Sequence, residues 1–95
     1  MDLDAIAKVK PQILEICARH GVQTIRVFGS VARGDARPDS DLDLLVTVGP
    51  NPGPWFPGGL IADLEDLLSL RVQVVTEAGL NTPLRSEVLS EAVPL

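Results

Sequence analysis

Two acidic residues, Asp41 and Asp43, carry the strongest chemical signal in this chain of 95 residues. They alternate with Leu42 and Leu44, and the two-residue period of a strand would place both carboxylates on one face. Like charges about 7 Å apart beside a buried sheet repel each other unless a cation lies between them. Oxygen ligands of this kind suit Mg²⁺ or Mn²⁺, with water and substrate phosphates completing the shell. The alternative is a solvated, polar strand edge.

Gly29 and Ser30 form a second chemical feature, directly after the apolar run of residues 25–28. A glycine in this place lets the backbone turn sharply and approach a ligand. A serine at a helix start adds a hydroxyl beside unpaired N–H groups, which makes a pocket for an anion. The same pair is also a common helix cap, so the pair alone does not settle its role. Nearby positive charge comes from three arginines, Arg26, Arg33 and Arg37.

Strands are expected to hold both features in place. Residues 25–28 and 42–46 are apolar and rich in β-branched side chains, as strands are. The polar segment between them is too long for a hairpin turn and contains a helix-compatible piece at residues 31–33. A third strand is predicted at residues 72–76.

Apolar residues at helical spacing predict three longer helices, over residues 4–20, 60–70 and 83–92. Pro11 leaves two alternatives, a bend in one helix or a firm helix that starts near Lys10 with Pro11 in its first turn, and we favour the bend. Gly21 is a plausible end for the helix. Asn81 and Thr82 are the expected cap of the last helix. The order of elements predicts one α/β (α+β) domain spanning residues 1–95, with a small three-stranded mixed sheet and helices packed mainly on one face.

Other polar and aromatic residues have structural as well as functional interpretations. His20 at a helix end is explained by the helix dipole, so we assign it no chemistry. Three acidic residues of the second long helix are interpreted as its solvated face: Asp63, Glu65 and Asp66. The proline- and glycine-rich residues 49–59 must form a loop, in which Trp55 and Phe56 either cover a ligand or partner site or anchor the loop on the core.

The composition restricts partners and compartment. A net charge of −5 and a pI near 4.6 argue against a nucleic-acid backbone as the main partner. Charged residues interrupt every apolar run, which argues against a membrane span, and the acidic amino terminus is unlike a signal peptide. With Cys17 as the one cysteine, no internal disulfide is possible, and a cytoplasmic location is expected.

The combined pattern of Gly29-Ser30, ten residues, and Asp41-x-Asp43 resembles the signature of the nucleotidyltransferase superfamily that includes DNA polymerase beta. Arg33-Gly34-Asp35 lies between the two halves. The compact length resembles the minimal nucleotidyltransferase branch of that superfamily. The resemblance implies a nucleotidyltransferase fold.

The resemblance also implies roles for these residues. Gly29 and Ser30 would hold the β- and γ-phosphates of a nucleoside triphosphate, and Arg33 would lie near them or position the loop. Asp41 and Asp43 would be the catalytic residues that bind the divalent metals. The implied reaction is attack of an acceptor hydroxyl on the α-phosphate with release of pyrophosphate, a two-metal displacement.

One position departs from the family pattern, in which a third carboxylate occupies the next apolar run. Gln73 stands at that position. Its amide can coordinate or hydrogen-bond, but it brings no charge and accepts no proton. The metal should therefore bind more weakly, and loss of a base would lower the rate by about 10² to 10⁴. Glu77 or Glu65 could substitute.

Three functions are compatible with this sequence. The first is transfer of AMP from ATP to a protein hydroxyl, which within the minimal branch suggests an antitoxin that adenylylates a tyrosine of a HEPN-type RNase toxin. The second is a degenerate module that neutralises its partner by binding alone. The third is modification of a small molecule of the aminoglycoside kind, for which a homo- or hetero-oligomer would have to complete the acceptor pocket.

Overall fold

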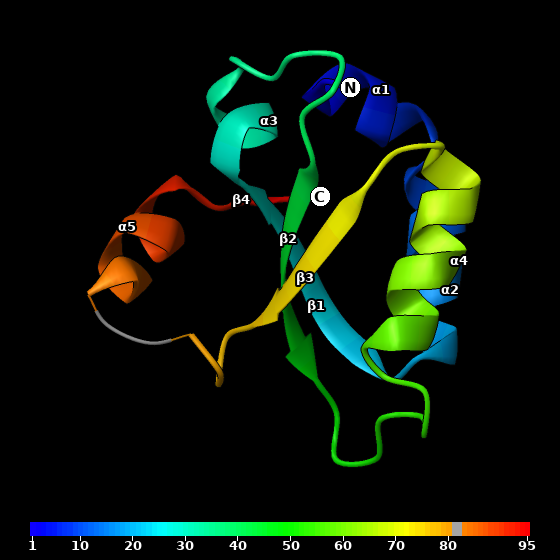
Figure 1. Cartoon of the computed structure of the whole chain (residues 1–95). Helices are drawn as coiled ribbons and strands as arrows, with labels where there is room; N and C mark the ends of the chain where they lie inside the picture. The colour runs from blue at the N-terminus through cyan, green and yellow to red at the C-terminus, as the bar shows by residue number, and fades with distance from the viewer. Residues whose placement is uncertain (81–82) are drawn as a thin grey trace.

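The computed structural model describes residues 1–80 and 83–95. Five helices and four strands are assigned in these ranges (Figure 1). In chain order they are α1 (Leu3–Lys8), α2 (Lys10–Arg19), β1 (Val22–Phe28), α3 (Gly29–Arg33), β2 (Leu42–Val48), α4 (Gly58–Leu68), β3 (Val72–Thr76), α5 (Leu84–Glu91) and β4 (Val93–Pro94).

The strands form one mixed sheet in the order β3-β2-β1-β4. β1 is antiparallel to both β2 and β4, whereas β2 and β3 are parallel. The mixed α/β class is as predicted, but the sheet has one strand more than expected. The additional strand, β4, has only two residues, which is too short for a periodic pattern, and one of them is a proline.

Helices α2 and α4 pack against each other and cover one face of the sheet (Figure 1). The core between them and the sheet is built from aliphatic side chains on alternate strand positions, among them Val27, Leu42, Leu44 and Val46. Helix α5 lies on the other side of the strands in Figure 1. The prediction that most helical packing is on one face therefore holds for α2 and α4.

The carboxylate-bearing face of β2 is the one turned away from this core. Strand alternation places Asp43 and Leu45 on the same face, opposite Leu44. Leu45 is fully buried, although it lies outside the main core cluster. The second face of the sheet is therefore covered at Leu45, so β2 is a central strand buried on both sides.

The favoured prediction of a single bent helix at residues 4–20 is wrong, and the alternative of a helix that starts near Lys10 is confirmed. α1 ends at Lys8, and α2 begins at Lys10 with Pro11 in its first turn. Because Pro11 has no N–H, it cannot continue the hydrogen-bond ladder of α1. Val9 leaves the helical conformation, with φ −111° and ψ 13°.

The other helix ends differ from the predictions by small shifts. Gly21 adopts a positive φ of 76° directly after α2, as a helix stop should. α4 ends at Leu68, two residues before the predicted end, and its C-cap Ser69 has a left-handed conformation with φ 56°. The predicted cap at Asn81 and Thr82 lies outside the described residues. None of the described helices is both long enough and apolar enough to cross a membrane.

Candidate active site

The predicted site residues meet at one end of the sheet, where β1 ends and β2 and β3 begin. The register pairs Phe28 with Asp43, and Asp43 with Gln73. Asp43 therefore lies between the end of β1 and Gln73. Gly29 follows Phe28 directly, so the two halves of the sequence motif meet through strand pairing.

Gly29 lies in close contact with the carboxylate of Asp43. A Cβ atom built on Gly29 would collide with Asp43 Oδ2. Gly29 also has φ 74°, a conformation that residues with a Cβ rarely adopt. Two independent features thus require glycine here, a close approach and a left-handed backbone.

Asp41 and Gln73 are joined by a hydrogen bond at the same end of the sheet. Gln73 Nε2 donates to Asp41 Oδ2 at 3.2 Å. The structure therefore places the Gln73 amide beside Asp41 and opposite Asp43, at the position where a third carboxylate is expected from the sequence. Within residues 1–80 and 83–95, no group of three or more acidic, histidine or cysteine side chains is arranged to hold a metal.

The donor set still fits a divalent cation of the magnesium type. Mg²⁺ is commonly held by one or two carboxylates and completed by water and substrate phosphates. Asp43 on β2 and Asp41 directly before β2 supply two carboxylates, and the amide of Gln73 is an additional oxygen ligand. The residues present therefore suit a metal that binds together with a phosphate ligand.

The electrostatics of Asp43 also favour a cation. Burial raises the pKa of its carboxyl, and the negative charges of Asp41 and Glu91 raise it further, while Arg33 opposes the shift. The ionised form of Asp43 is thus disfavoured in the protein alone. A bound cation would offset the repulsion.

The residues predicted to bind phosphate, Gly29, Ser30 and Arg33, all lie on α3. Ser30 is half-buried, and half of the Arg33 side chain is exposed to solvent. α3 ends at Gly34, which has a left-handed φ of 81°. The short helix therefore brings the backbone N–H of Gly29 and the guanidinium of Arg33 to the same end of the sheet as Asp43.

Glu91 is a site residue that sequence reasoning missed. Gly29 N donates to Glu91 Oε1 at 2.8 Å. Arg33 Nη1 donates to both carboxylate oxygens of Glu91, at 3.3 and 3.2 Å. Glu91 is 62 positions from Gly29, so no local pattern could have connected them.

The two glutamates considered as substitutes for the missing carboxylate are engaged elsewhere. Glu77 pairs with Arg26 at 2.7 Å and with Arg85 at 3.8 Å. Glu65 Oε2 accepts a hydrogen bond from the backbone N–H of Val72 at 3.0 Å. Both therefore have structural roles, and neither supplies the third carboxylate.

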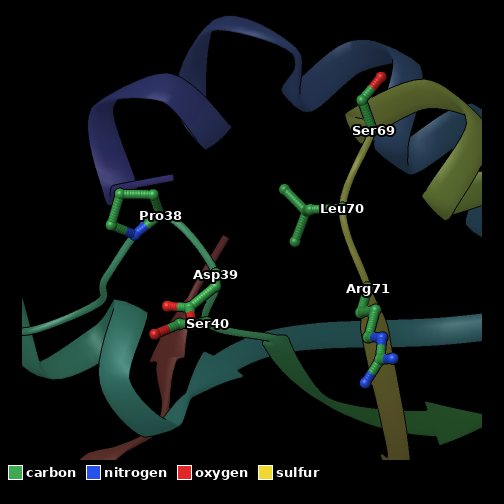
Figure 2. Close-up of a pocket in the computed structure, with 6 residues that line it drawn as sticks. All are labelled: Pro38, Asp39, Ser40, Ser69, Leu70 and Arg71. Carbon is green, nitrogen blue, oxygen red and sulfur yellow. The ribbon is translucent and has the colours of Figure 1, made fainter.

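A cavity of about 470 Å³ adjoins the Asp41 side of the site (Figure 2). One wall is the segment that leads into Asp41, and the other is the turn between α4 and β3. Figure 2 shows Leu70 projecting into the space between the two walls. The lining residues are Pro38, Asp39, Ser40, Ser69, Leu70 and Arg71. Its volume is in the range of small-ligand pockets.

The two aromatic residues of the long loop, Trp55 and Phe56, have different surroundings. Phe56 packs against the core, whereas Trp55 is 76% exposed. His20 Nε2 and Asp63 Oδ2 are 2.7 Å apart, and this pair joins α2 to α4. Asp63 is therefore not simply part of a solvated face, and His20 has a structural role at the helix end.

The sequence of this chain is similar to those of known proteins. The profile of the family described as "Nucleotidyltransferase domain" matches residues 10–95. Protein adenylyltransferase MntA of Thermococcus cleftensis is 42% identical over 79 residues, which cover 83% of this chain and 80% of the relative.

Two solved structures are also similar. One, described as a candidate minimal nucleotidyltransferase, has a TM-score of 0.86 and 49% identity, covering 100% of this chain and 97% of the other. A toxin–antitoxin structure with AMP-PNP has a TM-score of 0.75 and 22% identity, covering 90% of this chain and 70% of the other. At that identity the second likeness concerns the fold alone.

Proposed function

The chain belongs to the nucleotidyltransferase domain family, and from this premise we propose that it transfers AMP from ATP to a hydroxyl group of a protein partner. The observation that carries the proposal is the meeting of Gly29, Asp43 and Asp41 at one end of the sheet. This arrangement places an anion-binding backbone beside a carboxylate pair suited to a divalent cation. A metal-bound nucleoside triphosphate has the charges that both parts require.

In this proposal each residue has a distinct task. The N–H groups at Gly29 and Ser30 and the guanidinium of Arg33 bind the β- and γ-phosphates. Asp41 and Asp43 hold Mg²⁺ or Mn²⁺, which in two-metal sites stabilises the attacking and leaving oxygens of an in-line displacement. The acceptor oxygen forms a bond to the α-phosphorus, the bond to the leaving oxygen breaks, and pyrophosphate departs.

Gln73 sets a limit on the rate of this reaction. Its amide lies beside Asp41 and orients that carboxylate, but it does not accept the proton of the acceptor hydroxyl. The proton must then leave to solvent. We therefore expect a slow enzyme with weak metal affinity when no nucleotide is present.

The partner is proposed from the relatives. One relative is named a protein adenylyltransferase, and a structure of the same fold is described as a toxin–antitoxin. Together with the resemblance to minimal nucleotidyltransferases, this supports a protein toxin of the HEPN RNase type as the acceptor, modified on a tyrosine. Such an antitoxin would act in the cytoplasm, where ATP is available.

The test uses purified protein, radiolabelled ATP, Mg²⁺ and the protein encoded beside it. Label should appear on the partner, and Asp41→Asn should reduce the transfer by at least 10², because the variant loses a charged metal ligand. Asp66→Asn, an exposed position on α4, removes the same charge away from the site and should transfer normally. Absence of transfer with every nucleotide and divalent ion tried would refute the proposal.

A second candidate function is neutralisation of the partner by binding alone. Two observations favour it, the amide at Gln73 and the 76% exposure of Trp55. In that case Asp41→Asn and Asp43→Asn should still neutralise the partner, and Trp55→Ala should weaken the complex. Loss of neutralisation in the aspartate variants, with the complex intact, would exclude this candidate.

A further inference from the structure

We propose that Glu91 is an internal anion that occupies the phosphate-binding groups of the site and must leave when a nucleoside triphosphate binds. The inference rests on the proposed function and concerns the regulation of the same site. Glu91 ends α5, so its departure would couple nucleotide binding to the position of the last helix.

The contacts of Glu91 are those that a phosphate oxygen would make. Its carboxylate accepts the backbone N–H of Gly29 at 2.8 Å and faces the guanidinium of Arg33 with both oxygens. A backbone N–H has one proton to donate, so Gly29 cannot give a full hydrogen bond to Glu91 and to a phosphate together. The two anions therefore compete for the same donor.

Glu91 is on the wrong side of the site to replace the missing third carboxylate. Gln73 belongs to β3 and flanks Asp43 on one side, whereas Gly29 follows β1 and flanks Asp43 on the other. Glu91 contacts Gly29 and precedes β4, at the far edge of the sheet from β3. It therefore acts on the phosphate side of the site.

Helix α5 has few buried contacts that would oppose a movement of Glu91 away from Gly29. The described residues of α5 include none that is buried, and among the helices α5 packs mainly against α3 (Figure 1). Its first turn is held by Arg85, whose Nη1 donates to the backbone oxygen of Glu77 at 2.8 Å. The end that carries Glu91 is joined to the site by the contacts to Gly29 and Arg33. Beyond it, β4 pairs with β1 over two residues, and Val93 and Leu95 pack against the core.

Electrostatic repulsion favours movement of the Glu91 carboxylate out of the site. Glu91 shares the site with Asp41 and Asp43, and Arg33 is the cation beside it. A triphosphate adds several negative charges to the same place. Repulsion between the phosphates and Glu91 then favours release of the carboxylate into solvent.

The experiment measures Kd for ATP, pyrophosphate and adenosine in the wild type and in Glu91→Gln, with Mg²⁺ present. Glu91→Gln should bind ATP and pyrophosphate about five-fold more tightly, because the competing charge-assisted contacts are weakened. Adenosine carries no phosphate, so its affinity should not change. Glu87→Gln is the matched control, an exposed acid on the same helix whose loss should leave all three affinities unaltered.

Amide hydrogen exchange is a second measurement, and a general effect of charge on affinity would not change its result. In the wild type, addition of Mg²⁺ and ATP should increase amide exchange in residues 84–94, although ligand binding usually slows exchange. The inference is overturned if the wild type binds ATP and Glu91→Gln binds it no more tightly, or if exchange in α5 falls on binding. If no variant binds any nucleotide, the proposed function itself fails.

Discussion

At the scale of single residues, the amide of Gln73 has two opposite effects on the candidate site. It lowers the negative charge at the sheet end, where Asp41 and Asp43 already repel each other. In the proposed reaction it also brings no proton acceptor, where the resemblance implies a carboxylate. A neutral side chain at this position therefore favours the stability of the metal-free protein, and under the proposed function we expect it to lower metal affinity and turnover.

Restoring the carboxylate should reverse this balance. We expect Gln73→Asp to raise kcat for AMP transfer on the order of 10²-fold, because general base catalysis typically contributes that much or more. Steady-state transfer assays at saturating Mg²⁺ would measure it. Gln12→Asp, an exposed position on α2, is the control for the added charge. An unchanged or lower kcat in Gln73→Asp would show that the third carboxylate is not what limits the rate.

The Asp43 carboxyl should make stability depend on pH. Its pKa in the folded protein is raised above the ordinary aspartate value of 3.8, chiefly by burial and then by the charge of Asp41. Its contribution to stability is therefore fully present below pH 3.8 and is lost as pH rises through the folded-state pKa.

Asp43→Asn should then be more stable than the wild type at pH 7 without metal. We expect a rise in Tm of about 2 to 4 °C, since one like-charge contact of this kind is worth roughly half a kcal/mol. The gain should shrink as pH falls toward the ordinary pKa of an aspartate, 3.8. Thermal melts with EDTA would measure it, with Glu15→Gln on the exposed face of α2 as the control. A lower Tm in Asp43→Asn at pH 7 would contradict the expectation.

At the scale of elements, α3 begins with one glycine of positive φ and is followed by another. Gly29 has φ 74° and Gly34 has φ 81°. They differ in their surroundings: a Cβ on Gly29 would meet the Asp43 carboxylate, whereas a Cβ on Gly34 would meet nothing within 4 Å. A substitution at Gly34 therefore measures the cost of backbone strain alone, whereas the same substitution at Gly29 adds the cost of crowding against Asp43.

Alanine at each glycine tests this separation. Gly34→Ala should lose about 1 to 2 kcal/mol of unfolding free energy, the cost of a left-handed residue with a Cβ. Gly29→Ala should lose at least about 1 kcal/mol more, because the Asp43 carboxylate must also move. It should also bind Mg²⁺ and ATP more weakly. Urea unfolding and nucleotide titration would measure these effects, and equal losses in the two variants would contradict the account.

The elements also show how far the sequence could be interpreted. Periodicity located β3 at its bounds and β2 within two residues, but β1 begins at Val22, three residues before the predicted strand. The meeting of Gly29 with Asp43 comes from the antiparallel pairing of β1 with β2, which was not predicted from the sequence. The break at Val9 was harder to predict, because a proline can either bend a helix or occupy the first turn of a new one.

Other features depend on contacts that local patterns do not encode. β4 is held by its pairing with β1 and has no periodicity of its own. Glu91 ends an exposed helix and has the composition of a solvated residue, so its contact with Gly29 follows only from the complete topology. The separate roles of Trp55 and Phe56 likewise depend on which ring reaches the core.

At the scale of the whole molecule, α2 and α4 join the sheet in one apolar core, and Cys17 lies in it. The Cys17 side chain is 3% exposed, and burial raises the pKa of its thiol to about 11. A thiol reacts as the thiolate, so both access and ionisation protect it. Its reactivity should therefore report opening of the core.

Cys17 should react with a disulfide reagent at pH 8 at least about 10² times more slowly in the folded protein than in urea, because the raised pKa alone lowers the thiolate fraction by about that factor. Rates of thiol labelling at increasing urea would measure this. Leu64→Ala, which opens a cavity at a fully buried position of α4, should accelerate labelling. Leu84→Ala, at an exposed position on α5, should not. Rapid labelling of the folded wild type would contradict the predicted burial.

The long sequence separation between Gly29 and Glu91 has a consequence for folding. Asp41 and Gln73 are 32 positions apart, and Gly29 and Glu91 are 62 apart. Loop closure over such distances is entropically costly, so contacts of this kind form late. The nascent chain can therefore pair β1 with β2 and bring Gly29 to Asp43 before α5 has formed. During that interval the backbone N–H of Gly29 and the guanidinium of Arg33 are without their partner Glu91, and they gain it only when the last helix is in place.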